Sequence, residues 1–188
     1  MDALALIAVC MSMGQQTTMP SPWRDPGFAK LIWVQSPNFG ERPSQAVVDT
    51  VVVHSTANGS LEGTTRWFCN PESQVSAHFT IGKDGSIVQH VSTFSRAWHA
   101  GKSVLDGKEN LNDFSLGIEL VNLNDGKDPY PEAQTTALRF LIGAMKRRFD
   151  LKVITSHEHV ALPHGRKSDP LHFPWKELEG LGLRIERD

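Results

Sequence analysis

Cysteine is nearly absent from the sequence, since Cys10 and Cys69 are its only two among 188 residues. Two thiols are too few for a cysteine-rich zinc site or for the disulfide framework of a small secreted domain. A single disulfide between them stays open, but nothing in the sequence favours it.

A strong charge of either sign is also missing, because the formal net charge is −2 at pH 7. Such a balance gives no electrostatic reason to expect binding to nucleic acid or to an anionic membrane surface. We therefore expect no nucleic-acid partner.

Long apolar runs are lacking as well. Ala3–Met13 is apolar but well below the roughly 20 residues that span a bilayer. It is similar to the apolar part of a signal peptide, although no Lys or Arg precedes it. Cys10 could carry a lipid, although Val9 is a bulky residue to precede the signal-peptide cleavage site that lipid attachment would need. We expect residues 1–30 to be an N-terminal segment with a signal-like or lipoprotein-like region and a linker, or a frayed or mis-started terminus.

Location follows from that segment. An export signal would place the protein in the cell envelope, the periplasm or outside the cell, and its absence would leave the protein in the cytoplasm. Membrane association is expected only if Cys10 is lipidated.

Two common hydrolase motifs are missing too. No Gly-x-Ser-x-Gly occurs, which argues against a serine hydrolase of that type. His157-Glu158-His159 has the wrong spacing for the His-Glu-x-x-His helix of zinc peptidases.

The most informative stretch is Ser156–Pro170, which holds three histidines, two carboxylates and two cations. The apolar, β-branched run Leu151–Thr155 precedes it and predicts a buried strand. A strand that ends at His157, followed by a loop carrying Asp169, would hold an imidazole beside a carboxylate. Both are normal zinc ligands, and a catalytic zinc has three protein ligands and one open position.

A second run has the same design, because Thr50–Val53 is β-branched and leads directly to His54. Strands alternate with helices along the chain, and a hairpin around Lys83-Asp84-Gly85 interrupts them. We therefore expect residues 31–188 to form a single α/β domain with a central mixed sheet and helices packed on it. Ligand sites of such sheets lie beyond the strand ends, where His54 and His157 fall. The expected strands are Leu31–Val34, Thr50–Val53, Ser76–Ile81, Ser86–Val91, Phe114–Val121 and Leu151–Thr155; the expected helices are one through Trp67–Cys69, Pro131–Phe149 and Phe173–Leu181.

Other polar residues around these strands suggest chemistry. Glu119 lies inside the apolar strand Phe114–Val121, where an unpaired carboxylate has a raised pKa suited to a general base, unless it faces outward. Lys167 lies two residues before Asp169 and could stabilise an oxyanion, or be a solvated loop lysine. His159 is the rival of His157, because residues two apart on a strand share a face, and it could instead lie behind the ligands.

Further histidines and tryptophans are less informative. His78 and His99 lie near the expected groove and could contact substrate, whereas His90 is expected on a strand surface. Trp67 and Trp98 are expected to be packing residues, although an exposed Trp near a groove can stack on sugar.

Five segments in order now carry a resemblance: Val52–Thr56, Val75–Phe79, Trp98–Gly101, Ser115–Leu120, and His157 with Gly165–Pro170. Together they resemble the zinc-dependent N-acetylmuramoyl-L-alanine amidases of the type 2 family, which are related to peptidoglycan recognition proteins. The likeness covers roughly residues 37–175. Family members commonly have His-x-Asp before a shorter Pro-Gly-Arg-Lys loop, whereas this chain has His159 at the third position and a loop that is longer by two residues.

The resemblance implies a hydrolase that cleaves the amide between N-acetylmuramic acid and L-alanine in peptidoglycan or its fragments, in cell-wall degradation. By motif, His54, His157 and Asp169 match the zinc ligands, Glu119 the catalytic carboxylate, and Lys167 the transition-state-stabilising lysine. A peptidoglycan or muropeptide substrate and a monomer are expected. The alternative is a non-catalytic peptidoglycan-binding module on the same fold.

Overall fold

The computed structural model of this chain describes residues 31–187. The predictions for residues 1–30, including lipid attachment at Cys10 and the linker, lie outside the described residues. Within residues 31–187, no helix is both long and apolar enough to cross a bilayer.

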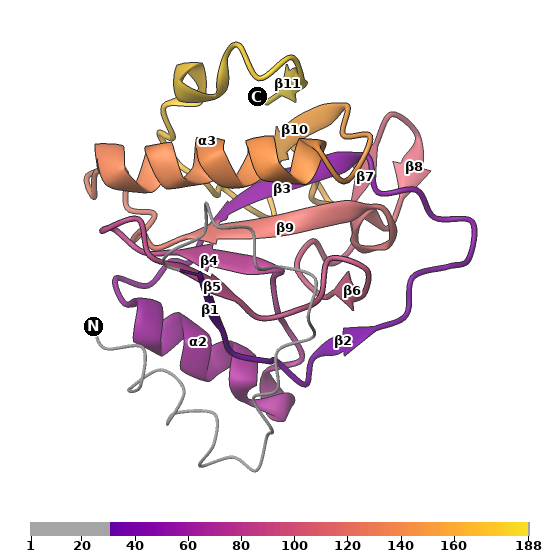
Figure 1. The fold of residues 1–188 in the computed structure, drawn as a ribbon, viewed down its shortest axis with the longest axis horizontal. Helices are drawn as coiled ribbons and strands as arrows, with labels where there is room; N and C mark the ends of the chain where they lie inside the picture. Colours follow the sequence, from indigo (N-terminus) through magenta and orange to yellow (C-terminus); the bar gives the residue numbers. More distant parts are fainter. Residues whose placement is uncertain (1–30, 188) are drawn as a thin grey trace.

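A seven-stranded sheet runs through the centre of the molecule (Figure 1). Its strand order is β1-β5-β4-β9-β3-β10-β11, with β4 and β5 antiparallel and the other neighbouring pairs parallel. The predicted α/β class with a mixed sheet is thereby confirmed. The strands are β1 (Leu31–Trp33), β3 (Thr50–Ser55), β4 (Phe79–Ile81), β5 (Ile87–Gln89), β9 (Ser115–Leu120), β10 (Val153–Ser156) and β11 (Arg184–Glu186).

Two short ribbons stand beside this sheet. One pairs β2 with β6 and the other pairs β7 with β8, both antiparallel. Their bounds are β2 (Phe39–Gly40), β6 (Arg96–Ala97), β7 (Val104–Leu105) and β8 (Lys108–Glu109).

Helices pack on both faces of the sheet. The long helix α3 (Glu132–Lys146) crosses one face (Figure 1), and its buried side chains join those of the central strands in the main core. The shorter α2 (Leu61–Cys69) packs with Val88 in a second core. Ile87 belongs to the main core and Val88 to the second, and consecutive strand residues point to opposite faces, so α2 and α3 lie on opposite faces of the sheet.

Among residues 31–187, the remaining helices are short. A four-residue helix α4 (His157–Val160) follows β10 directly. Three 3-10 turns occupy Pro71–Ser73, Leu111–Asp113 and Trp175–Leu178.

Several predicted elements differ in extent. The predicted helix Pro131–Phe149 begins after Pro131 and ends at Lys146. The predicted helix Phe173–Leu181 is reduced to the turn Trp175–Leu178, because Gly180 and Gly182 adopt positive φ and stop helical continuation.

His90 is not a surface residue, so that prediction was wrong. Its side chain is fully buried, and its ring nitrogens lie within hydrogen-bond distance of Thr80 Oγ1 (3.0 Å) and of the Val34 carbonyl (3.2 Å). β1 pairs alongside β5 and covers this end of the hairpin, a long-range contact that the local pattern does not contain.

Candidate functional site

Strand alternation brings His54 and Glu119 together. Along β3, Val51 and Val53 face the main core under α3, so Val52 and His54 face the other side. Along β9, Leu116, Ile118 and Leu120 likewise belong to the main core. His54 is directly opposite Glu119 in the parallel pairing of the two strands. The two polar side chains are therefore neighbours on the face opposite α3.

His157 reaches the same place from the end of β10. Ser156 ends that strand, and its hydroxyl accepts a hydrogen bond from the backbone N–H of His159 (2.9 Å), which starts α4. The backbone N–H of Glu158 donates to the Asp169 carbonyl (2.9 Å), so the loop is tied back onto the helix. This tie places the Asp169 carboxylate beside both imidazoles.

The three side chains form a donor set that fits a metal ion. Asp169 Oδ2 lies 3.1 Å from His157 Nδ1 and 3.4 Å from His54 Nδ1, and the three donor atoms lie within 4.8 Å of one another. Bonds of about 2.0–2.1 Å to a tetrahedral zinc would hold neighbouring donors about 3.3 Å apart. The spacing and the His-His-Asp chemistry both suit zinc.

The structure separates the two rival histidines. His157 is buried within this group, whereas His159 is only partly buried and lies outside it. The expectation that residues 157 and 159 share a face assumed a strand. They lie in α4, where two positions differ by about 200° around the helix axis.

Two of the three donors, His54 and Asp169, have pKa values shifted by their surroundings. Burial lowers the pKa of His54 to about 4, aided by repulsion from His157, so this ring is neutral near pH 7. Burial alone would raise the pKa of Asp169, but the His157 and His54 rings beside its carboxylate outweigh that effect and hold the pKa well below its ordinary value. Neutral imidazoles and an ionised carboxylate are the forms that bind a metal.

The pKa of Glu119 is raised, in contrast to the lowered pKa values of His54 and Asp169. Burial, with a smaller contribution from the charge of Asp169, raises the pKa of Glu119 to about 8, and Lys167 opposes the rise. Its Oε2 atom is buried and has no hydrogen-bond partner among the described residues. A buried, unsatisfied carboxylate oxygen beside a donor set for a metal is suited to exchange a proton with a bound molecule.

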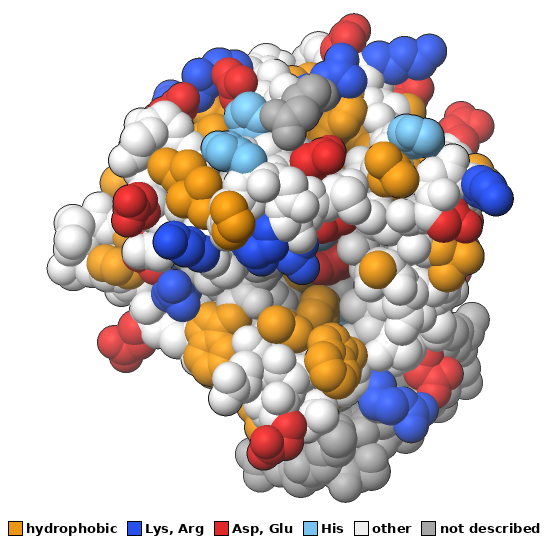
Figure 2. Space-filling model, turned by 180° about the vertical axis from the view of Figure 1, so that it is seen from behind, with side chains coloured by type: hydrophobic (Ala, Val, Ile, Leu, Met, Phe, Trp, Pro, Cys, Tyr) orange, Lys and Arg blue, Asp and Glu red, His pale blue; other side chains and the backbone are white. Residues whose placement is uncertain are grey.

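These side chains line one pocket of about 290 Å³. His54, His157, Asp169, Glu119 and Lys167 all contribute to it, so each predicted site residue lies there. Figure 2 shows a hollow near the centre of the face, with basic side chains on one side and hydrophobic ones on the other. The remaining lining is Ser55, Thr56, Ala57, Asn58, Thr64, Trp67, Phe68, Val75, Ser76, Trp98, His99 and Asn124.

Two aromatic residues differ in their roles from simple packing. Trp67 is 54% exposed and lines the pocket, so the expected packing role was wrong and the alternative of an exposed Trp near a groove fits it. It lies on the exposed side of the short helix α2. Trp98 is partly buried and also borders the pocket.

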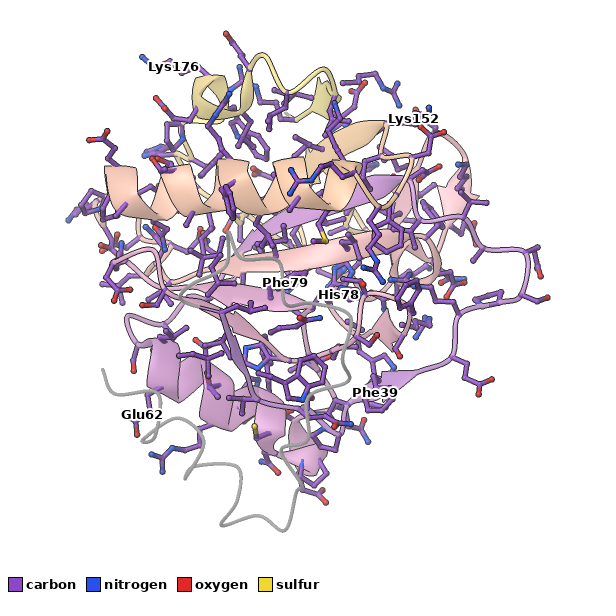
Figure 3. All side chains as sticks on the ribbon, viewed as in Figure 1. Phe39, Glu62, His78, Phe79, Lys152 and Lys176 are labelled. Carbon is purple, nitrogen blue, oxygen red and sulfur yellow. The ribbon has the colours of Figure 1, made fainter. Side chains whose placement is uncertain are left out.

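The two histidines expected near the groove have different positions. His78 is fully buried beside Phe79 near the middle of the molecule (Figure 3), and its Nδ1 accepts a hydrogen bond from the Gly117 N–H (3.0 Å). His99 does line the pocket, but behind His54, with its Nδ1 3.0 Å from His54 Nε2. The sequence singled out Trp98–Gly101 without revealing this contact.

Asn124 was missed by sequence reasoning. Its Oδ1 accepts a hydrogen bond from the Leu171 N–H (2.8 Å), and its Nδ2 donates to Ser168 Oγ (3.2 Å). These two residues lie on either side of the segment that carries Asp169. No local pattern marks Asn124, because its partners are more than 40 positions away.

Comparison with known proteins agrees with this geometry. A family model described as N-acetylmuramoyl-L-alanine amidase matches residues 44–172. The chain is 34% identical over 170 residues to the 1,6-anhydro-N-acetylmuramyl-L-alanine amidase AmpD of Escherichia coli strain K12, covering 79% of this chain and 90% of that protein.

Solved structures share the fold. The crystal structure of a selenomethionine derivative of AmpD has a TM-score of 0.70 and 31% identity, covering 81% of this chain and 94% of that one. The Escherichia coli amidase AmiD, in complex with anhydro-N-acetylmuramic acid-L-Ala-D-gamma-Glu-L-Lys, has a TM-score of 0.64 and 28% identity, covering 78% of this chain and 66% of that one.

Proposed function

The chain belongs to the N-acetylmuramoyl-L-alanine amidase family, and on that premise we propose that His54, His157 and Asp169 hold zinc while Glu119 and Lys167 act on the bound substrate. The reaction is hydrolysis of the amide between the lactyl carbonyl of N-acetylmuramic acid and the nitrogen of L-alanine. One observation carries the proposal: a donor set that fits zinc shares a pocket with a buried, unsatisfied carboxylate and an ammonium group.

Zinc, when bound, supplies a Lewis acid that lowers the pKa of water and polarises a carbonyl group. Glu119 takes the proton of the attacking water on a carboxylate oxygen and returns it to the departing alanine nitrogen. Its raised pKa suits a group that must both accept and donate a proton near neutral pH. The Lys167 ammonium, which also lines the pocket, stabilises the negative charge that develops on the carbonyl oxygen.

The proposed substrate is a peptidoglycan fragment with a 1,6-anhydro sugar end. Support comes from relatives named as 1,6-anhydro-N-acetylmuramyl-L-alanine amidases and from the anhydro-sugar peptide held by AmiD. The pocket supplies the exposed ring of Trp67 and the polar side chain of Asn58, a combination suited to a sugar with an attached peptide. This is a catalytic role, in contrast to the binding-module alternative.

The test is digestion of an anhydro-muropeptide and of its reduced, ring-opened counterpart, followed by mass spectrometry. We expect the zinc-loaded protein to release the intact stem peptide from the anhydro form, and more slowly from the reduced form. Equal rates on both would contradict the anhydro preference, and cleavage of another bond would contradict the assigned reaction.

Replacing Glu119 separates catalysis from metal binding. Glu119→Gln should lower turnover by about a hundredfold or more while zinc content stays the same, because only the proton-transfer group is lost.

Asp169→Ala should lose zinc in elemental analysis, because one of three ligands is removed. Glu62→Gln is a matched control, since Glu62 lies on the outer side of α2, away from the pocket (Figure 3).

Unchanged turnover in Glu119→Gln would exclude the proposed proton transfer. Full zinc occupancy in Asp169→Ala would exclude that residue as a ligand.

The cellular location and the monomeric state stay predictions. Location depends on residues 1–30, so the mass of the native protein purified from its source tests it. A retained terminus favours a cytoplasmic role in recycling fragments, and a cleaved or lipidated one favours the cell envelope.

A further inference from the structure

His99 contacts the candidate metal ligand His54 from behind. His54 Nε2 and His99 Nδ1 lie 3.0 Å apart, and the two rings meet edge to face at 88° with centroids 5.1 Å apart. Both side chains are buried. The nitrogen of His54 that faces Asp169 is Nδ1, so the contact with His99 uses the nitrogen that the metal would leave unused.

The hydrogen bonds around His99 have a single consistent direction. A neutral His54 that binds metal through Nδ1 carries its proton on Nε2, so it must donate to His99 Nδ1. His99 then carries its own proton on Nε2, which lies 3.2 Å from Ser115 Oγ. The Ser115 hydroxyl donates to the Leu111 carbonyl, which can only accept. The series ends at a backbone carbonyl, and this fixes the proton position on each ring.

The structure holds the His99 ring firmly in place. The ring lies over Gly117 on β9, where an added Cβ would come within 2.4 Å of His99 Cγ. The backbone N–H groups of His99 and Ala100 both donate to Asn112 Oδ1, at 3.1 and 2.8 Å. A bulkier residue at position 117 would therefore displace the ring.

Ala100, the residue after His99, contacts the second histidine of the donor set, His157. His157 Nε2 lies 3.3 Å from the Ala100 carbonyl, while His157 Nδ1 faces Asp169. The dipeptide His99-Ala100 thus presents one acceptor to each imidazole of the donor set. Such acceptors behind ligand histidines fix ring orientation and strengthen metal binding.

We propose that His99 is a positioning residue, which holds the Nε2–H tautomer of His54 and directs its Nδ1 toward zinc. The inference rests on the proposed zinc site, and it assigns His99 no contact with the reacting atoms. Loss of this acceptor should weaken zinc binding by about 10- to 100-fold.

The test measures zinc affinity of the whole chain by competition with a chelator. His99→Leu removes the acceptor and should weaken zinc binding by that factor. His99→Asn places an amide oxygen where Nδ1 stood, so it should retain an affinity within a few-fold of wild type. His90→Leu is the matched control, because His90 is also buried but lies within hydrogen-bond distance of Thr80 and Val34 instead of a metal ligand.

A second measurement needs no variant. Nitrogen NMR of the zinc-loaded protein should show His54 bound through Nδ1 and protonated on Nε2. Wild-type affinity in a folded His99→Leu variant, or zinc on Nε2 of His54, would overturn the role of His99. No zinc binding by the wild-type chain would instead contradict the proposed function, so the two failures are distinguishable.

Discussion

A shift of one residue along β3 would turn the His54 ring into the core beneath α3 and carry Val53 to the pocket. Side chains alternate between faces at every step of a strand, so register decides which residue has a chemical role. The same holds on β9, where Glu119 lies between Ile118 and Leu120 of the main core. At the scale of the residue, the alternation of side chains between the two faces of β3 and β9 decides which residues form the site.

Glu119 should make the stability of the metal-free protein depend on pH. Its pKa is about 8 in the folded protein against 4.5 for an ordinary Glu, so between these values the folded state binds more protons than the unfolded state. The contribution of Glu119 to stability is therefore lost as pH rises from 4.5 to 8. Denaturant unfolding of metal-free wild type and Glu119→Gln should show the variant gaining relative stability, by up to roughly 1 kcal/mol per pH unit.

A constant difference between the two proteins across that pH range would show that Glu119 ionises normally. Glu62→Gln is the matched control, because Glu62 pairs with Arg66 on the surface of α2 and does not line the pocket.

At the scale of elements, two loops hold the site together. The loop after β9 carries Asn124, which is bonded to Ser168 and Leu171 on either side of Asp169. Tyr130 adds a third tie, with its hydroxyl 2.6 Å from Ser55 Oγ and donating to the Leu171 carbonyl (3.2 Å). The loop that supplies Asp169 and Lys167 is therefore positioned by the loop after β9 and the end of β3.

Asn124→Gly should loosen this loop without straining the backbone. Asn124 has φ of 56°, which glycine adopts easily, so the variant loses the two side-chain hydrogen bonds and keeps the turn. We expect turnover to fall about tenfold and zinc affinity to fall, with little change in thermal stability. Unchanged kinetics and affinity would mean that other contacts suffice to hold the loop.

At the scale of the whole molecule, buried histidines should make the metal-free fold sensitive to acid. Burial lowers the pKa of His54 and His90 to about 4 and that of His78 to about 3, with the charge of Arg42 adding to the effect at His78. The unfolded state binds more protons below pH 6.5, so stability is present above that value and is lost as pH falls toward 4. Denaturant unfolding at several pH values measures the loss.

The zinc-loaded protein should start from a higher stability at pH 7 and lose it more steeply on acidification, because protons compete with zinc for the ligand side chains. A stability that stays flat from pH 6.5 to 4 would contradict neutral buried histidines.

Much of the molecule follows from local sequence. The β-branched runs predicted β3 and β10, and the histidines after them predicted where the donor set forms. Ser60 and Thr64 were both possible caps of α2 from the sequence, and Ser60 is the cap, accepting from the Gly63 N–H (3.0 Å). Glu119 was identified because a carboxylate inside an apolar strand needs a reason to be there.

Features that depend on contacts between distant parts of the chain could not be predicted from the sequence. His90 is buried because β1 pairs beside β5, and no local pattern encodes that pairing. The strand model for His157 and His159 failed because Ser156 caps a helix at that point. Asn124 and His99 act through partners far along the chain, and only the assembled sheet brings them together.

The helix α3 covers one face of the sheet and the pocket opens on the other. The alternating side chains of β3 and β9 therefore have two different roles. Val53, Ile118 and Leu120 point into the main core and stabilise the fold, whereas their neighbours His54 and Glu119 point into the pocket. A change at Glu119 can therefore remove the chemistry while the core residues on either side of it keep the sheet intact. Most other residues that line the pocket lie outside the strands, for example residues 56–58, so a new specificity can arise there without disturbing strand pairing.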